Sequence, residues 1–252
     1  MKFAWLCSHE SYQPELLVEQ AVQAEAAGFD MVLPSDHFHP WVDDTSAAGF
    51  AWSWLGAAAA RTSHVELGTS VTCPLFHYHP ALIAQAAATV DRLSGGRFTL
   101  GLGTGEAINE TPLGWSFPGY SERMARMREA LIIIRRLLDG EKLDFDGEYY
   151  RTATARLYSP PVHRIPVLVA AGGTTTARFA GETADGLITS VKDPGETNAK
   201  VIGPFQDARA DGSSASAGTI LATRWTVLAK NDEEAWTRCR PCAACVLPGD
   251  LR

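Results

Sequence analysis

The 252-residue sequence lacks a long apolar run, a basic stripe and an abundance of cysteine. No stretch approaches the ~20 consecutive apolar residues that a membrane-spanning helix needs, so no membrane association is expected. Acidic residues (29) outnumber Lys and Arg (22), and the scattered cations argue against nucleic acid as a partner. The N-terminus enters a strand-like segment with no apolar signal region ahead of it, which predicts a cytoplasmic protein.

The five cysteines do not form a disulfide framework. Cys7 and Cys73 lie far apart within apolar segments, where we expect reduced thiols. Cys239, Cys242 and Cys245 form a C-x2-C-x2-C run that superficially resembles half of an iron–sulfur motif. No fourth cysteine follows in the remaining seven residues, so we expect no metal there.

Segments typical of strands and helices alternate along the chain, and 46% of its residues are hydrophobic, as in a globular enzyme. The expected strands are 3–7, 31–33, 65–71, 97–103, 166–170, 186–189 and 219–228. The expected helices are 14–27, 50–60, 80–93, 121–138, 174–181 and 199–209. This alternation predicts a parallel α/β sheet, open or closed. Polar residues and glycines follow several different strands, which favours a (β/α)8 TIM barrel over a Rossmann sheet with one switch point.

Two features interrupt the alternation. Apolar residues alternating around Asp146-Gly147 predict a tight turn and an inserted hairpin near 142–158. Only seven strands are found, and little chain remains after Trp236 for an eighth βα unit. We therefore expect residues 1–252 to form one barrel domain with an incomplete C-terminus, truncated before the eighth strand or completed by another chain.

The segment 35–41, which contains Asp36, His37, His39 and Trp41, follows the second strand directly. A histidine there can exchange protons near neutral pH, and Asp36 could orient it, hold a cofactor or ligate a metal. The alternative is a loop histidine satisfied by neighbouring backbone. Because such residues gather at the C-terminal end of a strand, a functional site is favoured.

A glycine-rich segment at 101–109 follows the fourth strand and carries Glu106 and Asn109. Its glycine spacing is not that of the dinucleotide fingerprint. We expect its alternate glycines to let a flat ring or a phosphate approach the backbone, with Glu106 projecting into the barrel mouth. A plain flexible loop is the alternative.

Gly172 and Gly173 join the fifth strand to a helix that begins with three threonines. Backbone N–H groups at such a helix start form an anion site. Ordinary capping by Thr174 explains the same residues equally well.

Taken in order, these motifs resemble the luciferase-like superfamily, in the branch that contains coenzyme F420-dependent glucose-6-phosphate dehydrogenase. The matching segments are 35–41, 50–54, 67–71, 79–85, 103–109, 145–150 and 170–173. The resemblance extends to about Leu228 and continues weakly through 247–250. It implies a TIM barrel that holds a deazaflavin at its C-terminal mouth.

The resemblance also implies roles for individual residues. His37 and Glu106 take the catalytic acid/base positions, with the assignment of acid and base left open. Ser70-Val71 matches a bulge with a non-proline cis peptide behind the cofactor ring, and Cys73 stands where a threonine is usual. The implied cofactor contacts are Asp36, Ser70, Val71, Cys73, Thr104, Gly105, Asn109, Gly172, Gly173, Thr175 and Thr176. The implied substrate contacts are Glu10, Trp41, Ser190 and Lys192.

The expected activity is hydride transfer between coenzyme F420 and a small CH–OH or carbonyl substrate, possibly a sugar phosphate such as glucose 6-phosphate. A homodimer is expected. The nearest alternative is an FMN-dependent luciferase-like oxidoreductase or monooxygenase. Another is a metal-dependent barrel hydrolase that uses Asp36, His37, His39, His77 and His79. A third alternative is a catalytically inactive barrel that acts as a binding protein.

Overall fold

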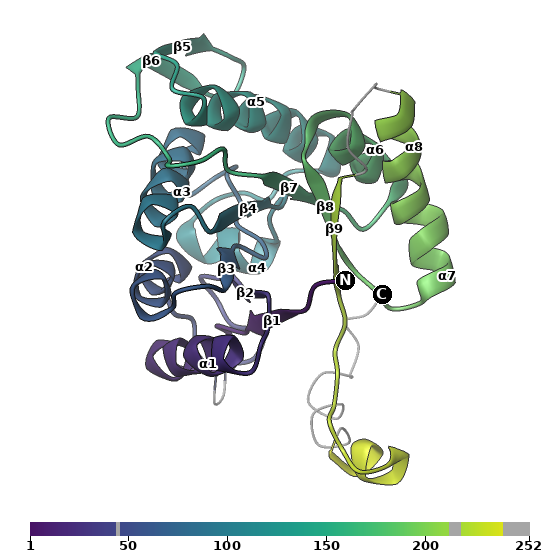
Figure 1. The fold of residues 1–252 in the computed structure, drawn as a ribbon. Coiled ribbons are helices and arrows are strands. Elements are labelled where there is room, and N and C mark those ends of the chain that lie inside the picture. Colours follow the sequence, from purple (N-terminus) through teal and green to yellow (C-terminus); the bar gives the residue numbers. More distant parts are fainter. Residues whose placement is uncertain (44–45, 212–217, 239–252) are drawn as a thin grey trace.

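A parallel sheet with helices on its outside dominates the computed structural model (Figure 1), which describes residues 1–43, 46–211 and 218–238. The seven predicted strands are all present, neighbouring strands are parallel, and their order in the sheet follows the chain. The strands are β1 (Ala4–Cys7), β2 (Met31–Pro34), β3 (Glu66–Gly68), β4 (Phe98–Leu102), β7 (Val167–Ala170), β8 (Gly186–Ser190) and β9 (Thr219–Thr223).

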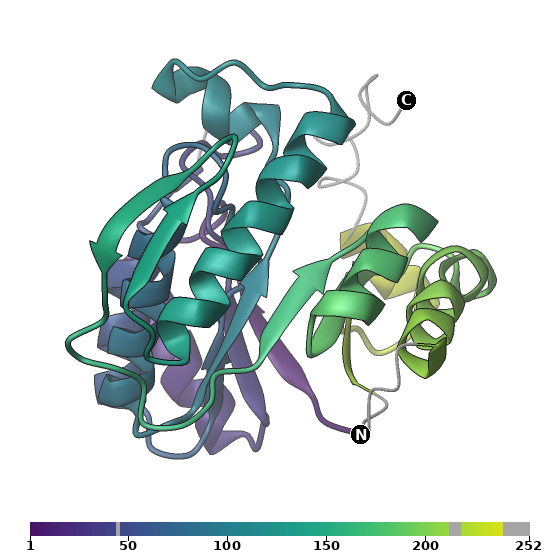
Figure 2. The same cartoon turned by 90° about the horizontal axis from the view of Figure 1, so that it is seen from above.

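The helices connect these strands and cover the outer face of the sheet (Figures 1 and 2). They are α1 (Pro14–Ala26), α2 (Ala51–Arg61), α3 (Pro80–Ser94), α5 (Tyr120–Leu138), α6 (Thr174–Thr183), and the consecutive α7 (Pro194–Thr197), η2 (Asn198–Ile202) and α8 (Gly203–Asp211). Two short elements after β4, α4 (Ala107–Glu110) and η1 (Thr111–Leu113), were not predicted. In the part of the chain that the structure describes, no helix is long and apolar enough to cross a membrane.

The core lies between the sheet and these helices. Helix α5 illustrates why the sequence folds this way, because Met127, Leu131 and Ile134 recur at helical spacing and are all buried. Burying one such side chain contributes about 1.5–3 kcal/mol. The strands present continuous apolar runs, as expected of a parallel sheet covered on its faces.

Strand β9 is shorter than the predicted 219–228. Its last residue, Thr223, pairs with Ser190, the last residue of β8, so the chain beyond has no neighbour in register. Trp225 and Leu228 are accordingly exposed. Among the described residues, β1 and β9 are the two edges of the sheet. The three cysteines at 239, 242 and 245 lie outside the described residues.

Strand β3 also ends earlier than predicted, at Gly68 rather than residue 71. The peptide bond between Ser70 and Val71 is cis, as the resemblance implied. Directly after it, Thr72 forms an isolated bridge with Leu102 of β4. The segment that follows β3 is thereby held against the end of β4.

The predicted hairpin is present as β5 (Leu143–Asp146) and β6 (Arg151–Ala155), beside α5 (Figure 2). The predicted tight turn at Asp146-Gly147 was wrong, because the connection comprises residues 147–150. The carboxylate of Glu129 on α5 accepts the backbone N–H groups of residues 148, 149 and 150. This tertiary contact stabilises the longer loop and leaves no local signal in the hairpin sequence.

Candidate active site

Because all strands of the sheet are parallel, the residues that follow them meet at one end of it. There the Nε2 atom of His37, after β2, lies 3.3 Å from Oε1 of Glu10, after β1. The same atom lies 3.7 Å from Oε2 of Glu106, after β4. The structure thus brings together His37 and Glu106, as predicted. The close contact with Glu10 was not predicted.

Glu10 is a buried carboxylate, 8% exposed, whose second oxygen is held by two hydroxyl groups. Ser35 and Ser8 donate hydrogen bonds to its Oε2 at 2.6 and 2.9 Å. The Ser35 hydroxyl in turn accepts the backbone N–H of His9 at 3.0 Å. With Oε2 engaged in this way, Oε1 is the oxygen that faces His37.

Glu106 is the more accessible of the two carboxylates, with a half-exposed side chain. Partial burial raises the pKa of Glu106 above its ordinary value, and the charge of Glu10 adds to this effect, while His37 opposes it. A carboxylate with a raised pKa is better suited to take up a proton than a fully solvated one.

Asp36 faces a different set of partners. Its carboxylate accepts hydrogen bonds from the hydroxyls of Thr72 and Tyr78, both located after β3. Burial raises the pKa of Asp36, although these two hydroxyls favour its charged form. Neither partner was predicted, because the contacts span 36 and 42 residues and leave no local pattern.

The short helix α4 ties two of the mouth loops together. The side-chain oxygen of Asn109 accepts the backbone N–H groups of Phe38 and His39, and its nitrogen lies 3.4 Å from Nδ1 of His37. The adjacent Glu110 is fully buried, and its Oε2 lies 2.8 Å from Nδ1 of His77. The loops after β2 and β3 are therefore both fixed to α4.

The glycines of 101–105 allow segments of the protein itself to pack closely together. A Cβ atom on Gly101 would lie 2.1 Å from the carbonyl oxygen of Thr69, and one on Gly103 would lie 2.5 Å from Cγ2 of Val71. Gly105 has φ +78° and faces the thiol of Cys73. On the side where a Cβ atom would lie, these glycines are covered by the protein itself. The approach of a ring or phosphate to their backbone stays a prediction.

The loop before α6 has the open geometry that an anionic group needs. A Cβ atom on Gly172 or Gly173 would meet nothing within 4 Å, and no side chain caps the helix. The Thr174 hydroxyl donates to the carbonyl of Lys200, so capping by Thr174 was the wrong alternative. A phosphate group can therefore approach the N–H groups at this helix start. The loop at Gly172 and Gly173 has room for the phosphate of a deazaflavin or flavin cofactor.

The remaining candidates lie around this mouth. The Trp41 ring is 60% exposed and lies 5.2 Å from the ring of His37. Thr175 is exposed, whereas the hydroxyl of Thr176 lies 2.6 Å from that of Tyr120. Ser190 and Lys192 are exposed at the C-terminal end of β8, and Ser70, Val71, Cys73 and Thr104 are partly buried. Their contacts with a cofactor or substrate remain predictions.

The histidines that a metal-dependent hydrolase would need face separate partners. Nδ1 of His39 lies 3.0 Å from the carbonyl of Pro40, and Nδ1 of His79 accepts the N–H of Ala81 to cap α3. His77 is paired with Glu110. Over residues 1–43, 46–211 and 218–238, no group of three or more His, Cys, Asp or Glu side chains is arranged to hold a metal.

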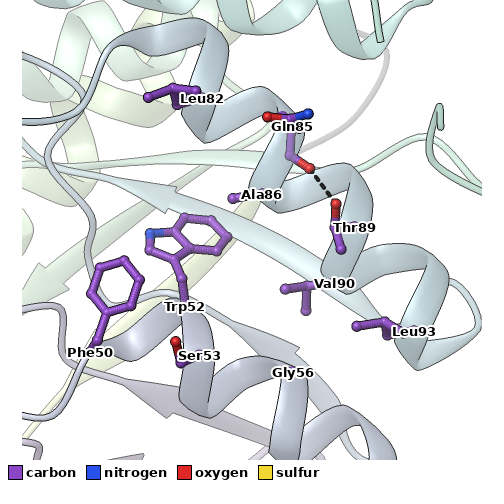
Figure 3. A pocket seen from close by; sticks show the side chains of 10 residues that line it. All are labelled: Phe50, Trp52, Ser53, Gly56, Leu82, Gln85, Ala86, Thr89, Val90 and Leu93. Atoms are coloured by element: carbon purple, nitrogen blue, oxygen red, sulfur yellow. Dashed lines mark hydrogen bonds between the residues drawn. The ribbon is translucent and has the colours of Figure 1, made fainter. Parts of the chain in front are cut away.

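A separate hollow of about 320 Å³ lies on the outside of the barrel, between α2 and α3 (Figure 3). Its lining is mainly apolar and includes Phe50, Leu82 and Leu93, each more than half exposed. None of the residues at the mouth contributes to it. This surface is therefore distinct from the candidate active site.

Comparison with known proteins assigns the architecture to a family. The family model described as Luciferase-like monooxygenase matches residues 1–247. The chain belongs to the luciferase-like family. A solved F420-dependent secondary alcohol dehydrogenase, in complex with an F420–acetone adduct, superimposes with a TM-score of 0.91 at 32% identity, over 98% of this chain and 76% of that one. A coenzyme F420-dependent tetrahydromethanopterin reductase from Methanopyrus kandleri, at 23% identity and a TM-score of 0.83, shows the same fold.

Curated relatives within this luciferase-like family carry one recurring name. The F420-dependent glucose-6-phosphate dehydrogenase of Intrasporangium calvum is 49% identical over 191 residues, which are 75% of this chain and 57% of the relative. That of Segniliparus rotundus is 44% identical over 221 residues, 87% of this chain and 66% of the relative. The chain thus spans less than two thirds of the length of these relatives.

Proposed function

We propose that this luciferase-like chain is an F420-dependent dehydrogenase or reductase that acts on a small CH–OH or carbonyl compound. The observation that carries the proposal is the histidine His37 between the carboxylates of Glu10 and Glu106, at 3.3 and 3.7 Å. Oxidising a carbinol releases a proton as well as a hydride, and this arrangement can handle the proton. The names of the relatives support F420 as the hydride acceptor.

A bound deazaflavin supplies hydride chemistry, and the protein supplies binding and orientation. The N–H groups at Gly172 and Gly173, with the hydroxyl of Thr175, would hold its phosphate at the start of α6. Ser70, Val71 and Asp36 would contact its ring system, as the resemblance implies. Thr104, Gly105, Cys73, Asn109 and Thr176 are further proposed contacts, as the resemblance implies.

The proposed substrate lies on the side of His37 that Trp41 and Glu10 border. An amphipathic ring such as Trp41 can cover the apolar face of a small alcohol or a sugar. Lys192 and Ser190 at the end of β8 are the proposed contacts of a phosphate group. Glucose 6-phosphate is accordingly the first substrate to test, and a simple secondary alcohol is the second.

The cofactor assignment is tested by titrating the purified chain with F420 and, separately, with FMN, while following the fluorescence of each. The proposal predicts saturable binding of F420 that is clearly tighter than binding of FMN. Tight FMN binding without F420 binding would contradict it and would favour the FMN-dependent alternative.

We also propose that the protein is a cytoplasmic homodimer. The apolar surface between α2 and α3, with Phe50, Leu82 and Leu93 exposed (Figure 3), supports an interface between two copies. Cytoplasmic location is supported by the free thiols of Cys7 and Cys73.

A further inference from the structure

His9 is a fully buried histidine that the proposed proton transfer does not use. It follows β1, and its Nδ1 lies 2.8 Å from the carbonyl oxygen of Gly49. A carbonyl oxygen can only accept, so Nδ1 carries a proton and donates it to this hydrogen bond. His9 thereby attaches the segment 47–50, which leads into α2, to the end of β1.

The segment lies very close to the His9 ring. A Cβ atom on Gly49 would lie 3.2 Å from Nδ1 of His9 and 2.5 Å from Cγ of Pro14, so only a glycine fits this position without a shift. The backbone N–H of Ala47 donates to the carbonyl of Glu10 at 3.2 Å. The segment is therefore bound both to the ring of His9 and to the backbone of its neighbour Glu10.

The second ring nitrogen of His9, Nε2, is surrounded differently. It is buried and has no hydrogen-bond partner among the described residues. The ring of Trp54 packs against that of His9 at right angles, with 5.3 Å between the centroids. A neutral ring with its proton on Nδ1 has only a lone pair at Nε2. A second proton would create a buried, charged N–H donor without an acceptor, which is costly.

We propose that the hydrogen bond from His9 to Gly49 is an acid-sensitive attachment, which holds the segment 47–50 at the end of β1 only while the His9 ring is neutral. When the ring takes up a proton, the segment should detach so that the charged ring reaches water. Because Ala47 also binds the backbone of Glu10, detachment should loosen one wall of the mouth. The proposal requires neither F420 nor turnover and goes beyond the proposed function.

The charges around His9 decide whether its buried ring stays neutral. Burial is the largest influence and lowers the pKa of His9 below its ordinary value of 6.5. The carbonyl of Gly49 and the carboxylates of Glu10 and Asp36 act in the opposite direction, but burial outweighs them. Trp54, which covers the ring from α2, carries no charge.

The direction of the pH effect follows from this lowered pKa. Above about pH 6.5, His9 is neutral whether the segment is attached or detached, so the attachment is at its strongest. As the pH falls below that value, the exposed ring of the detached form binds a proton while the buried ring does not. Detachment should then become more favourable by up to about tenfold for each pH unit. The effect levels off below the pKa of the buried ring.

The test is hydrogen–deuterium exchange of the chain from about pH 7.5 to 5, measured on peptides that contain residues 47–50 and corrected for the intrinsic rate at each pH. The expected result is constant protection of the Ala47 N–H at the upper end and a loss of about three- to tenfold between about pH 6.5 and 5.5. Low concentrations of urea should hardly change this exchange, because a local opening exposes little surface.

His9→Asn keeps an N–H donor for the carbonyl of Gly49 but cannot take up a proton, so it should abolish the loss of protection in acid. His64→Asn is the matched control, because the ring of His64 is almost fully exposed and contacts only the exposed side of Glu25. It should keep the loss of protection that the wild type shows.

Wild-type protection of residues 47–50 that does not change with pH would overturn the proposal. Exchange that responds to urea as steeply as that of Val167, in the middle of the sheet, would also overturn it, because the segment would then open only by global unfolding. If His9→Asn does not fold, NMR titration of the wild-type His9 ring, identified by its contact with Trp54, replaces that variant. A ring that titrates at or above about pH 6.5 would contradict the attachment.

Discussion

The Nε2 atom of His37 lies 3.3 Å from Oε1 of Glu10, so the loops after the first two strands are joined by a contact between two titratable side chains. Oε2 of Glu106 lies 3.7 Å from the same nitrogen. Each of the three comes from a different strand end. The geometry of the site therefore depends on the whole first half of the sheet.

Glu10→Gln should lower kcat by about 10–100-fold, because it removes a fixed negative charge beside the proton-handling histidine while preserving its shape. The affinity for F420 should change little. Ser8→Ala is the control, since Glu10 keeps its hydrogen bond to Ser35. It should lower kcat by no more than about threefold. Steady-state kinetics and a cofactor titration measure both. A Glu10→Gln variant with wild-type kcat would contradict this role of the contact.

The raised pKa of Glu106 predicts the acid limb of the pH profile. A Glu106 that takes up the substrate proton must be ionised, so kcat/KM should fall as the pH drops through a value above the ordinary 4.5 of a glutamate. Partial burial causes this shift. Glu106→Gln should remove the limb together with most of the activity. An acid limb that persists at the same pH in the residual activity of Glu106→Gln would assign it to another group.

The same shift has a consequence for stability. A carboxyl group whose pKa is raised by folding destabilises the folded state at pH values above that pKa. Glu106→Gln should therefore increase the free energy of unfolding at neutral pH, by less than about 1 kcal/mol because the side chain is half-exposed. This increase in the free energy of unfolding should disappear at pH values below the pKa that Glu106 has in the unfolded chain. Urea unfolding at both pH values checks the sign.

Asp185 stabilises the opposite end of the barrel. Its carboxylate accepts hydrogen bonds from the backbone N–H of Val167 and from Arg164 and Arg135, at 2.9, 2.7 and 3.2 Å. Burial opposes ionisation, but the Val167 N–H and the two arginines outweigh it and lower the pKa of Asp185. Asp185 therefore stabilises the folded state fully at pH values above its pKa in the unfolded chain. This stabilisation is lost as the pH falls through the lower pKa that Asp185 has in the folded chain.

Asp185→Asn should lower the free energy of unfolding by about 1–3 kcal/mol at neutral pH. This difference between variant and wild type should shrink towards strongly acidic pH. Asp146→Asn is the control, because the ion pair of Asp146 with Arg151 is exposed on both sides and should contribute less than about 1 kcal/mol. Urea unfolding over a range of pH measures both variants. Equal losses for the two, or a cost independent of pH, would show that Asp185 does not act through its charge.

Gly172→Ala should fold normally yet weaken cofactor binding by about tenfold or more, since a methyl group would occupy the surface that the phosphate approaches. Gly119→Ala is matched to it: this glycine precedes α5, has φ −61° and likewise has open space for a Cβ atom. That control should bind F420 as the wild type does. Equal affinities for both variants would place the phosphate elsewhere.

Leu93→Glu should convert the proposed dimer to a monomer, because it places a charge within the apolar surface between α2 and α3. Leu16→Glu is the control, since Leu16 is similarly exposed on α1 and does not line this surface. Light scattering after size-exclusion chromatography gives the mass directly. A dimeric Leu93→Glu, or a monomeric wild type, would reject this interface.

The number and order of the strands could be predicted from the sequence because apolar runs and helix periodicity are local signals. Strand ends could not, since the end of β9 depends on where β8 ends, at Ser190. The His37 loop and Glu106 were found because they directly follow predicted strands. Glu10 was expected only on the substrate side, and its contact with His37 bridges 27 residues with no pattern in either segment. The tie between Asn109 and His37 depends likewise on α4, which is too short to show periodicity.

The most direct test of the proposed function is an anaerobic assay that follows the loss of oxidised F420 absorbance when the chain is mixed with glucose 6-phosphate or with a secondary alcohol. The account predicts reduction of F420 with at least one of them. Deuterium at the carbinol carbon should slow this step, and His37→Gln and Glu106→Gln should each lower its rate by about 100-fold or more. Binding of F420 without any reduction by either substrate class, or reduction that survives in both variants, would contradict it.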